Sequence, residues 1–383
     1  MLEFFFWLLL FVLIYVCFGY PLVAAVLSRR KRPVLRDDAH LPTVSLLIPA
    51  YNEAAVIEET LRDKLALDYP ADRLEILVVS DASDDGTDEI VTRVGADSNI
   101  PIQLVRQLGR QGKTAGINRL VEQASGEILA FADANSVWAR DALARLVRNF
   151  ADPEVGYVTG KMVYTNPDGS LVGDGCSSYM RYENWLRERE TDMGSVVGVD
   201  GGIDAMRRPL YSPLRADQLP DFVQPLKVVE QGSRVVYEPE AQLREAALQD
   251  GGSEFSMRVR VTLRALWALK DMAHLMNPLR DPLFAFQLVS HKLLRYLGFV
   301  PLVLLALINL ALLNVGTIYV LTAAGQAAFY ILAYQGYRTP EGQPAPVWRM
   351  VPYYFSLLNI ACARAVLSFC RGERKVTWTP RQG

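Results

Sequence analysis

Two oxygen-bearing side chains, Asp133 and Asn135, follow the apolar run Ile128–Ala132. The run has the length of a buried strand of a parallel sheet, and open α/β sheets bind ligands just past the carboxyl ends of their strands. A carboxylate and an amide oxygen at this spacing suit a hard cation such as Mg²⁺ or Mn²⁺, whose coordination shell diphosphate oxygens would complete. A strand that simply ends in an Asx-type turn is the alternative.

Other polar residues also follow predicted strands or begin predicted helices. Asp81 follows the apolar run at residues 74–79, where its carboxylate could accept hydrogen bonds from a base or a ribose. Asp81 could instead cap the next helix, although the acidic pair at residues 84–85 is better placed for that role. Arg110 and Lys113 would bring cations to a junction between a loop and a helix, or would form only a solvated charge pair.

Strands alternate with helices between residues 44 and 132, which predicts an α/β fold with a doubly wound, mostly parallel sheet. In such a sheet the helix N-termini point at the strand ends, which favours a bound diphosphate. No G-x-G-x-x-G follows the first strand and no Walker sequence occurs, which argues against a dinucleotide oxidoreductase or an NTPase. The predicted strands are residues 44–48, 74–79, 102–105 and 127–132, and the predicted helices are residues 53–67, 112–124 and a segment ending at Val94.

The chain is long enough for a large core and for more than one domain, and its hydrophobic content is high for a soluble protein. Of the 383 residues, 51% are hydrophobic, and the formal net charge of −2 argues against a nucleic-acid partner. The four cysteines have no metal-site spacing, and we expect no disulfide framework. They are Cys17, Cys176, Cys362 and Cys370.

The first membrane span is predicted at Phe4–Leu27, an uncharged apolar run that is longer than the core of a signal peptide. The basic run Ser28–Arg32 follows at once. By the positive-inside rule, the N-terminus lies outside and the residues after the span are cytoplasmic. A cleaved signal is the disfavoured alternative, because the charge comes after the apolar run.

Three further apolar segments lie near the C-terminus. Tyr296–Val315 and Thr317–Gly336 each fit one span, whereas Val347–Cys370 is interrupted by Arg364. The basic cluster Arg371–Lys375 should stay inside, but an odd number of spans after a cytoplasmic domain would place it outside. Either the third segment lies in the interface or is re-entrant, or the charge rule fails here.

Two segments before these spans are predicted to lie on the cytoplasmic face of the membrane. Val259–Met276 is amphipathic, and Ser290–Arg295 comes just before the first C-terminal span. His291 is therefore expected to be interfacial rather than catalytic. The predicted domains are an N-terminal membrane helix at 1–32, a cytoplasmic domain at 33–255, interfacial helices at 256–295, and a C-terminal membrane region with its tail at 296–383.

A series of motifs resembles the family 2 glycosyltransferases, which have the GT-A fold. Their nucleotide-sugar half is matched in order and spacing by Pro49–Glu53, Ser80–Thr87, Gly112-Lys113 with Asn118, and Phe131–Asn135. The resemblance continues through Gly198–Arg208, Leu219–Phe222 and Gly232–Ala241, and covers roughly residues 43–262. The chain therefore looks like a membrane-anchored member of this family, similar to polysaccharide synthases and ceramide glucosyltransferases.

The resemblance implies inverting transfer of a sugar from a nucleotide-diphospho sugar, usually UDP-linked. Asp81 would hold the uracil or ribose, Asp133 and Asn135 would hold Mg²⁺ or Mn²⁺ at the diphosphate, and Asp221 would be the general base. A leaving diphosphate needs cations, and an acceptor hydroxyl needs a nearby carboxylate. Read locally, Asp221 could equally be a surface residue beside Pro220. The other implied donor contacts are Ala50, Tyr51, Glu53, Lys113, Arg258 and Arg260, and the implied acceptor contacts are Asp200, Gly201 and Trp185.

Some of these residues could have other roles, and two motifs differ from those of the family. Trp185 could stack on a sugar or pack in the core. Asn135 replaces the second aspartate of Asp-x-Asp, which lowers the charge of the metal site by one. The family's Gln-x-x-Arg-Trp is here Met257–Val261, which keeps Arg260 but puts processive polymerisation in doubt. Arg258 and Arg260 could instead lie over lipid phosphates in an interfacial helix.

We expect a multi-pass enzyme of the cell inner (plasma) membrane that builds a surface polysaccharide or glycolipid, with its catalytic domain in the cytoplasm. Its partners would be a nucleotide-sugar donor, a glycan or lipid acceptor, and the bilayer. Two or three C-terminal spans are few for a glycan channel, which favours a lipid-linked acceptor or a homo-oligomer. The alternative is a catalytically inactive scaffold or regulator that binds a sugar nucleotide, as Asn135 and the altered Gln-x-x-Arg-Trp would allow.

Overall fold

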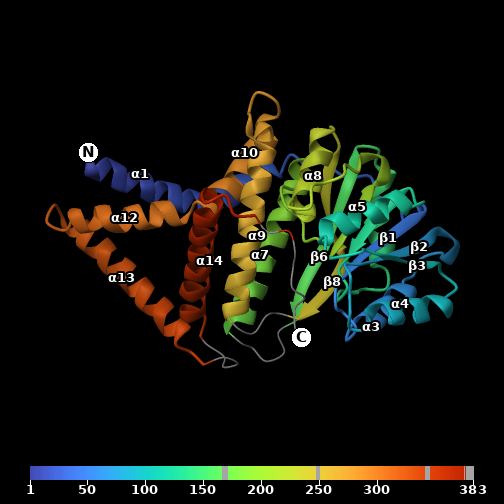
Figure 1. Cartoon of the computed structure of the whole chain (residues 1–383). Coiled ribbons are helices and arrows are strands. Elements are labelled where there is room, and N and C mark those ends of the chain that lie inside the picture. Colours follow the sequence, from blue (N-terminus) through green and yellow to red (C-terminus); the bar gives the residue numbers. More distant parts are fainter. Residues whose placement is uncertain (166–170, 247–250, 341–345, 375, 377–383) are drawn as a thin grey trace. The chain divides into compact units, whose positions relative to one another are not determined.

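The computed structural model in Figure 1 describes residues 1–165, 171–246, 251–340, 346–374 and 376. The chain forms two compact units, and each is discontinuous in sequence. The helical unit comprises Met1–Arg29, Tyr164–Glu183 and Ala246–Glu373, and the sheet unit comprises Arg30–Val163, Asn184–Glu245 and Arg374–Gly383. The long helix α7 (Leu171–Met193) contributes to both units. The four consecutive domains expected from the sequence stay a prediction.

The sheet unit is built on eight strands in the order β3-β2-β1-β4-β7-β6-β8-β5. Its first half is parallel and contains all four strands predicted from apolar runs. The register pairs Val44 with both Leu74 and Ile128, so β2 and β4 flank β1. These strands are β1 (Val44–Ala50), β2 (Leu74–Ser80), β3 (Ile102–Arg106) and β4 (Ile128–Ala132).

The second half of the sheet joins the first in the antiparallel sense. β7 (Ile203–Arg207) pairs antiparallel with β4 and with β6 (Val155–Thr165). β8 (Arg234–Ala246) pairs antiparallel with the short β5 (Val137–Trp138). The sheet is therefore mixed, and the doubly wound parallel arrangement is confined to residues before the end of β4.

The helices of the sheet unit follow the predicted alternation, with one helix starting later than predicted. The backbone N–H of Glu53 donates to Thr87 Oγ1 over 2.9 Å, and that of Ala54 donates to Asp85 Oδ2 over 2.9 Å. Because these bonds tie residues 53–54 to a neighbouring loop, the helix predicted from residue 53 begins only at Ile57. The helices are α3 (Ile57–Leu65), α4 (Thr87–Ala96), α5 (Lys113–Gln123), α6 (Ala142–Val147) and α8 (Pro220–Glu230).

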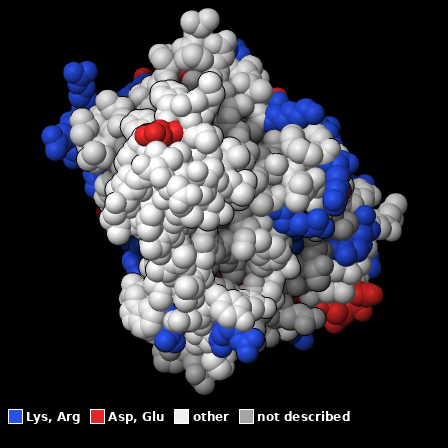
Figure 2. All heavy atoms as spheres, turned by 90° about the vertical axis from the view of Figure 1, so that its left-hand side faces the viewer, with Lys and Arg blue, Asp and Glu red and all other residues white. Residues whose placement is uncertain are grey.

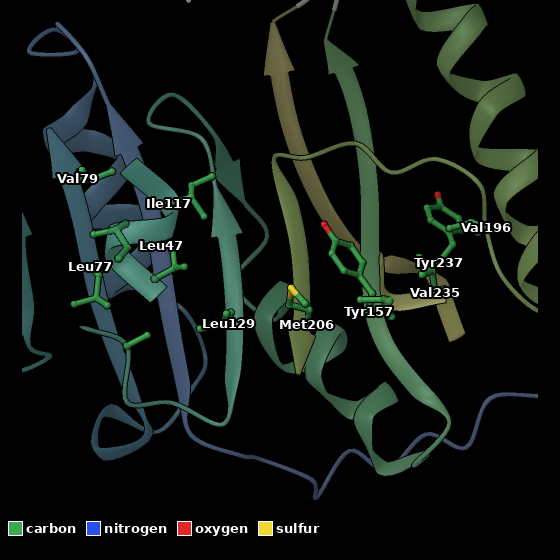
Figure 3. Packing of buried hydrophobic residues seen from close by; sticks show 13 residues of the cluster. Leu47, Leu77, Val79, Ile117, Leu129, Tyr157, Val196, Met206, Val235 and Tyr237 are labelled. Atoms are coloured by element: carbon green, nitrogen blue, oxygen red, sulfur yellow. The ribbon is translucent and has the colours of Figure 1, made fainter. Parts of the chain in front are cut away.

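One hydrophobic cluster is shared by the parallel and antiparallel halves of the sheet (Figure 3). Leu47 and Leu77 come from parallel strands, whereas Tyr157 and Met206 come from antiparallel strands, and Ile117 covers them from α5. All seven residues of β1 are buried, as expected for a central strand covered on both faces. The core therefore holds the carboxyl ends of β1, β2 and β4 in a fixed relation to β7.

The helical unit contains three helices that are long and apolar enough to cross a membrane, within the described residues. They are Leu2–Leu27, which contains α1 (Leu2–Ile14) and α2 (Tyr20–Leu27), α13 (Thr317–Tyr337) and α14 (Val347–Cys370). The other helices of this unit are α9 (Gly251–Asp271), α10 (Pro282–Gln287), α11 (Leu294–Tyr296) and α12 (Phe299–Ala311).

The face formed by α1, α12 and α13 is largely uncharged, as Figure 2 shows. Phe4, Phe11 and Phe18 are exposed on the N-terminal helix, as is Leu321 on α13. The buried Phe6 packs with residues of α12 and α13 in a small cluster of its own. Because soluble proteins rarely expose a contiguous apolar surface of this extent, this face fits a lipid environment.

The helix α12 is the C-terminal segment that does not reach the length of a span. Its 13 residues rise about 20 Å, less than the roughly 30 Å of a bilayer core. Together with Pro282–Tyr296 it forms a pair bent by 58°, which is either a broken span or a re-entrant loop. By itself, α12 is thus too short for the span that was predicted at Tyr296–Val315. Val347–Cys370 has the length and composition of a span despite Arg364.

Candidate active site

Lys113 joins two of the predicted functional aspartates. Its Nζ donates to Asp133 Oδ1 over 2.8 Å and lies 3.6 Å from Asp221 Oδ2. Lys113 is the first residue of α5, and Asp133 follows β4, so both belong to the loop edge of the parallel half-sheet. Residues predicted separately as the diphosphate site and the general base therefore meet around one ammonium group.

The start of α8 places Asp221 for this contact. Pro220 occupies the first turn of α8, where its missing N–H costs no helical hydrogen bond. Asp221 follows in the same turn, where the helix dipole favours a negative charge. The side chain of Asp221 is 28% exposed, so its carboxylate stays accessible to an incoming substrate while it contacts Lys113.

Gly201 allows the close approach of Asp221. It has a φ of +82°, and a Cβ built on it would lie 2.4 Å from Asp221 Cγ. The adjacent Asp200 forms an ion pair of 2.6 Å with Arg187, and both side chains are 5% exposed. The structure thus brings Gly201 to Asp221, the predicted base. The acceptor contact of Asp200 stays a prediction, because its carboxylate pairs with Arg187.

Gly201→Ala should lower kcat about 10- to 100-fold, because a small displacement of a catalytic group is costly. Gly232→Ala is a matched control, since Gly232 has a φ of +84° but open space around its Cβ position. Both substitutions carry the backbone cost of a left-handed residue, about 1–2 kcal/mol. Steady-state kinetics and Tm measured on both variants separate the two effects. Equal losses of activity would show that the contact with Asp221 is irrelevant.

Asp81 anchors the loop that precedes α5. Its carboxylate is 1% exposed and accepts hydrogen bonds from the backbone N–H of Gln111 (2.7 Å) and of Gly112 (3.1 Å). It does not cap α4, because the Asp85 carboxylate accepts the hydrogen bond from the Thr87 N–H. The predicted contact of Asp81 with a base or ribose stays a prediction.

Tyr51 and Arg110 form a flat, stacked pair beside Asp81. The Arg110 guanidinium carbon lies 3.6 Å from the centroid of the Tyr51 ring, and Arg110 Nε lies 3.7 Å from Asp81 Oδ2. Ala50 joins the same corner, because its carbonyl accepts from the Asp81 backbone N–H over 2.9 Å. Three of the predicted donor contacts, Ala50, Tyr51 and Asp81, are therefore adjacent.

Negative charge accumulates where the metal was predicted. Burial, together with the charges of Asp133 and Asp85, raises the pKa of Glu53 to about 7. In the described part of the chain, no group of three or more His, Cys, Asp or Glu side chains could hold a metal alone. Asp133 and Asn135 still offer the oxygen ligands that Mg²⁺ and Mn²⁺ prefer, so the residues fit a cation that diphosphate oxygens also bind.

Asp204 contacts residues of the candidate site, but it was not predicted as a site residue from the sequence. It is fully buried on β7, and its Oδ2 accepts hydrogen bonds from Tyr157 Oη (2.8 Å) and from the Gly201 N–H (3.0 Å). Burial raises the pKa of Asp204 to about 7, and the charge of Asp221 adds to the increase. An acidic residue between the apolar Ile203 and Ala205 is the signal that could have revealed it.

The contribution of Asp204 to the stability of the protein should fall as pH rises from about 4 to about 7. Its folded-state pKa lies above its unfolded value of 3.8, so ionisation opposes folding by up to about 4 kcal/mol once pH exceeds 7. Asp204→Asn keeps an acceptor for both hydrogen bonds and cannot ionise. Its Tm should exceed that of the wild type by a margin that widens across this range. A margin independent of pH would contradict the assignment.

The remaining predicted contacts are those of Trp185, Arg258 and Arg260. The ring of Trp185 lies 5.5 Å from the Arg189 guanidinium, and Trp185 does not line the small pocket, described below, that Lys113 and Asp221 share. Arg258 and Arg260 belong to the helical unit, where Arg258 Nε lies 2.7 Å from Glu254 Oε1. The predicted contacts of Arg258 and Arg260 with the donor therefore stay predictions.

A small pocket lies between Lys113 and Asp221. It is enclosed by residues from β1, β4, β6, α5 and α8, so both halves of the sheet contribute to its wall. Its lining residues are Pro49, Lys113, Ile117, Phe131, Ala132, Tyr157, Gly201, Tyr211, Pro220, Asp221 and Gln224.

Comparison with known proteins identifies this arrangement. Residues 45–212, which contain Asp81, Lys113, Asp133 and Gly201, match the family Glycosyl transferase family 2. The chain contains a family 2 glycosyltransferase domain. Asp221 lies just beyond the matched residues.

This glycosyltransferase is similar to two named synthases. It is 26% identical over 290 residues to the poly-beta-1,6-N-acetyl-D-glucosamine synthase of Staphylococcus aureus, a match that covers 71% of this chain and 68% of the synthase. It is 27% identical over 192 residues to the beta-monoglucosyldiacylglycerol synthase of Trichormus variabilis, covering 50% of this chain and 41% of that enzyme.

The fold of this glycosyltransferase is also found in a solved structure. The mannosyltransferase PcManGT from Pyrobaculum calidifontis, in complex with GDP-Man and Mn²⁺, superposes with a TM-score of 0.75 at 25% identity, covering 97% of this chain and 100% of that one. The predictions of a GT-A fold and of an enzyme that transfers sugars are confirmed. With its candidate spans, the chain is a membrane glycosyltransferase.

Proposed function

We propose that this enzyme transfers a sugar from a UDP-linked donor to a hydroxyl of a glycan or lipid acceptor, with inversion at the anomeric carbon. The observation that carries the proposal is the position of Lys113 between Asp133 and Asp221. A group that binds the leaving diphosphate and a group that binds the acceptor must face each other across the reacting carbon. Lys113 marks the point where these two halves of the site meet.

The proposed reaction is a single displacement. Asp221 accepts the proton of the acceptor hydroxyl as its oxygen attacks the anomeric carbon. The bond from that carbon to the diphosphate oxygen breaks on the opposite face, which inverts the configuration. The Lys113 ammonium stabilises the negative charge that develops on the departing diphosphate.

A divalent cation fits the other side of the leaving group. Asp133 and Asn135 would hold Mg²⁺ or Mn²⁺ together with diphosphate oxygens, and the cation would neutralise charge on the nucleoside diphosphate. The raised pKa of Glu53, which reflects the charges of Asp133 and Asp85 in addition to its burial, supports a site that needs positive charge. The mannosyltransferase named above binds Mn²⁺ with its donor, which supports the same assignment.

The nucleoside would lie against the stacked pair of Tyr51 and Arg110. An aromatic ring and a guanidinium plane offer flat surfaces for a base, and Asp81 holds Arg110 in place. Glu53 and Ala50 lie in the same loop region and would complete the donor side of the site.

We place the reaction at the inner face of the cell membrane. Basic residues follow the first span at Arg29–Arg32 and the last candidate span at Arg371–Arg374, whereas Lys375 lies outside the described residues. If α12 is re-entrant and both α13 and α14 cross, the two basic segments share one side, in agreement with the positive-inside rule. The similarity to a glucosyldiacylglycerol synthase and to a polysaccharide synthase supports a surface glycolipid or glycan as product.

Product analysis tests this proposal. The purified full chain in nanodiscs is incubated with Mn²⁺ and UDP-glucose, UDP-N-acetylglucosamine, UDP-galactose or GDP-mannose, plus bacterial lipid extract or oligosaccharides. Mass spectrometry should find one added sugar on a lipid or a glycan from a UDP donor, and NMR should show an inverted anomeric configuration. Retained configuration, or transfer from GDP-mannose alone, would contradict the proposal.

A further inference from the structure

Gln224 is a buried side chain whose amide has no hydrogen-bonding partner in the described part of the chain. It is 3% exposed, and neither its Nε2 nor its Oε1 makes a hydrogen bond there. Buried polar atoms in native proteins are almost always paired, because an unpaired amide loses its bonds to water without compensation. An amide with both a donor and an acceptor unsatisfied therefore indicates that another molecule completes it.

The position of Gln224 points to the substrate. It follows Asp221 by three residues on α8, so both side chains lie on the same face of the helix. Both also line the pocket beside Lys113. The residue with the unsatisfied amide thus belongs to the lining of the pocket that holds the proposed base.

The two tyrosine hydroxyls of this pocket already donate hydrogen bonds within the protein. Tyr157 Oη donates to Asp204, and Tyr211 Oη donates to Asn118 Oδ1 over 2.7 Å. The remaining wall includes apolar side chains of Ile117 and Phe131. Apart from Lys113 and Asp221, which the proposed reaction assigns to the diphosphate and the acceptor, a ligand group that enters this pocket meets an apolar wall and the residue Gln224, whose amide has hydrogen bonds left to make.

We propose that Gln224 recognises a polar ring substituent of the transferred sugar and so helps to determine which donor is used. The inference rests on the proposed function. Lys113 faces the diphosphate and Asp221 faces the acceptor hydroxyl, so the sugar that moves between them must border a pocket lined by both. The substituent is a hydroxyl or an acetamido group, since each offers a hydrogen-bond donor and an acceptor oxygen to the amide.

The thermal stability of a Gln224 variant distinguishes recognition of the sugar from a structural role of Gln224. Gln224→Met keeps a similar volume and removes two unsatisfied polar atoms, so the free protein should have a Tm equal to or above that of the wild type. A structural glutamine would show the opposite, because its loss would lower the Tm. Gln231→Met is the matched control, since Gln231 follows the end of the same helix and bonds to the Leu210 carbonyl.

Binding experiments on the full chain in nanodiscs test the proposal. Isothermal titration with Mn²⁺ compares UDP with the UDP-sugar that the wild type binds best. For Gln224→Met, the Kd of the UDP-sugar should rise about 10- to 100-fold while the Kd of UDP is unchanged. Gln231→Met should change neither. Equal losses of affinity for UDP and UDP-sugar, or no loss for either, would overturn the role of Gln224.

Deoxy donors identify the recognised substituent. The donors tested are UDP-sugars that each lack one hydroxyl or the acetamido group. One of them should bind the wild type more weakly than the complete donor does. The same deoxy donor and the complete donor should bind Gln224→Met with equal affinity. If every deoxy donor weakens both proteins alike, Gln224 contacts no substituent and the inference fails. If the wild type binds no nucleotide sugar at all, the proposed function itself is wrong.

Discussion

Asp221→Asn should lower kcat by about 10³-fold and leave the Kd of the donor nearly unchanged. Asparagine has the same shape as aspartate but cannot accept the proton of the acceptor hydroxyl. The donor side of the site, around Tyr51, Arg110 and Asp133, keeps its contacts. Steady-state rates of sugar transfer, together with donor affinity from titration calorimetry, measure the two quantities separately.

Asp217→Asn serves as the control for the charge change. Asp217 lies four residues before Asp221 and pairs with Arg215 at 3.1 Å, away from the pocket. Its substitution removes the same charge without removing a base, so kcat should stay within about threefold of the wild type. An Asp221→Asn enzyme with more than a tenth of wild-type activity would exclude Asp221 as the general base.

Asp133→Ala is expected to have the second largest effect, a loss of about 10²- to 10³-fold in kcat/KM. The substitution removes the carboxylate that would bind the cation and also the 2.8 Å partner of Lys113. In the wild type, EDTA should weaken donor binding. In Asp133→Ala, EDTA should change it little, because the two perturbations remove the same interaction. Donor titrations with Mn²⁺ and with EDTA on both proteins measure this non-additivity.

Asn135→Asp is the matched substitution in the opposite direction. It restores a second carboxylate and should lower the Mn²⁺ concentration needed for half-maximal activity. If Asp133→Ala keeps a full response to EDTA and Asn135→Asp leaves the Mn²⁺ requirement unchanged, the cation does not bind at these residues.

The parallel half of the sheet could be predicted from the sequence because its strands are buried on both faces. Such strands read as continuous apolar runs, and Val44–Ala50 and Ile128–Ala132 both do. The antiparallel half could not be predicted in the same way. β6 and β8 pair with strands that are distant in sequence, and only the family resemblance drew attention to residues 198–208 and 232–241.

The candidate site was predictable residue by residue but not as an arrangement. Asp81, Lys113 and Asp133 follow strands or begin helices, and such positions can be read locally, whereas only the family resemblance singled out Asp221. The contact of Lys113 with two aspartates depends on how α5 and α8 pack, which local sequence does not specify. Gln224 was missed for the same reason, because the burial of an amide is a property of the whole fold.

The membrane region shows the limits of hydropathy read along the chain. Tyr296–Val315 is apolar along its whole length, but the structure ends α12 at Ala311 and bends it by 58° against the preceding segment. Apolar content alone does not show whether a helix is long enough to cross. The conflict between the charge rule and the number of spans disappears if this segment is the one that turns back.

The most direct test of the proposed mechanism is nucleotide release by the purified, detergent-solubilised chain. UDP- and GDP-sugars are supplied one at a time with membrane lipid extract, in Mg²⁺ or Mn²⁺ and in EDTA, and the released nucleoside diphosphate is quantified. We expect nucleotide release from a UDP-linked donor, and this release should require the cation and be abolished by EDTA. Release at the same rate in EDTA, or no release from any donor, would contradict it.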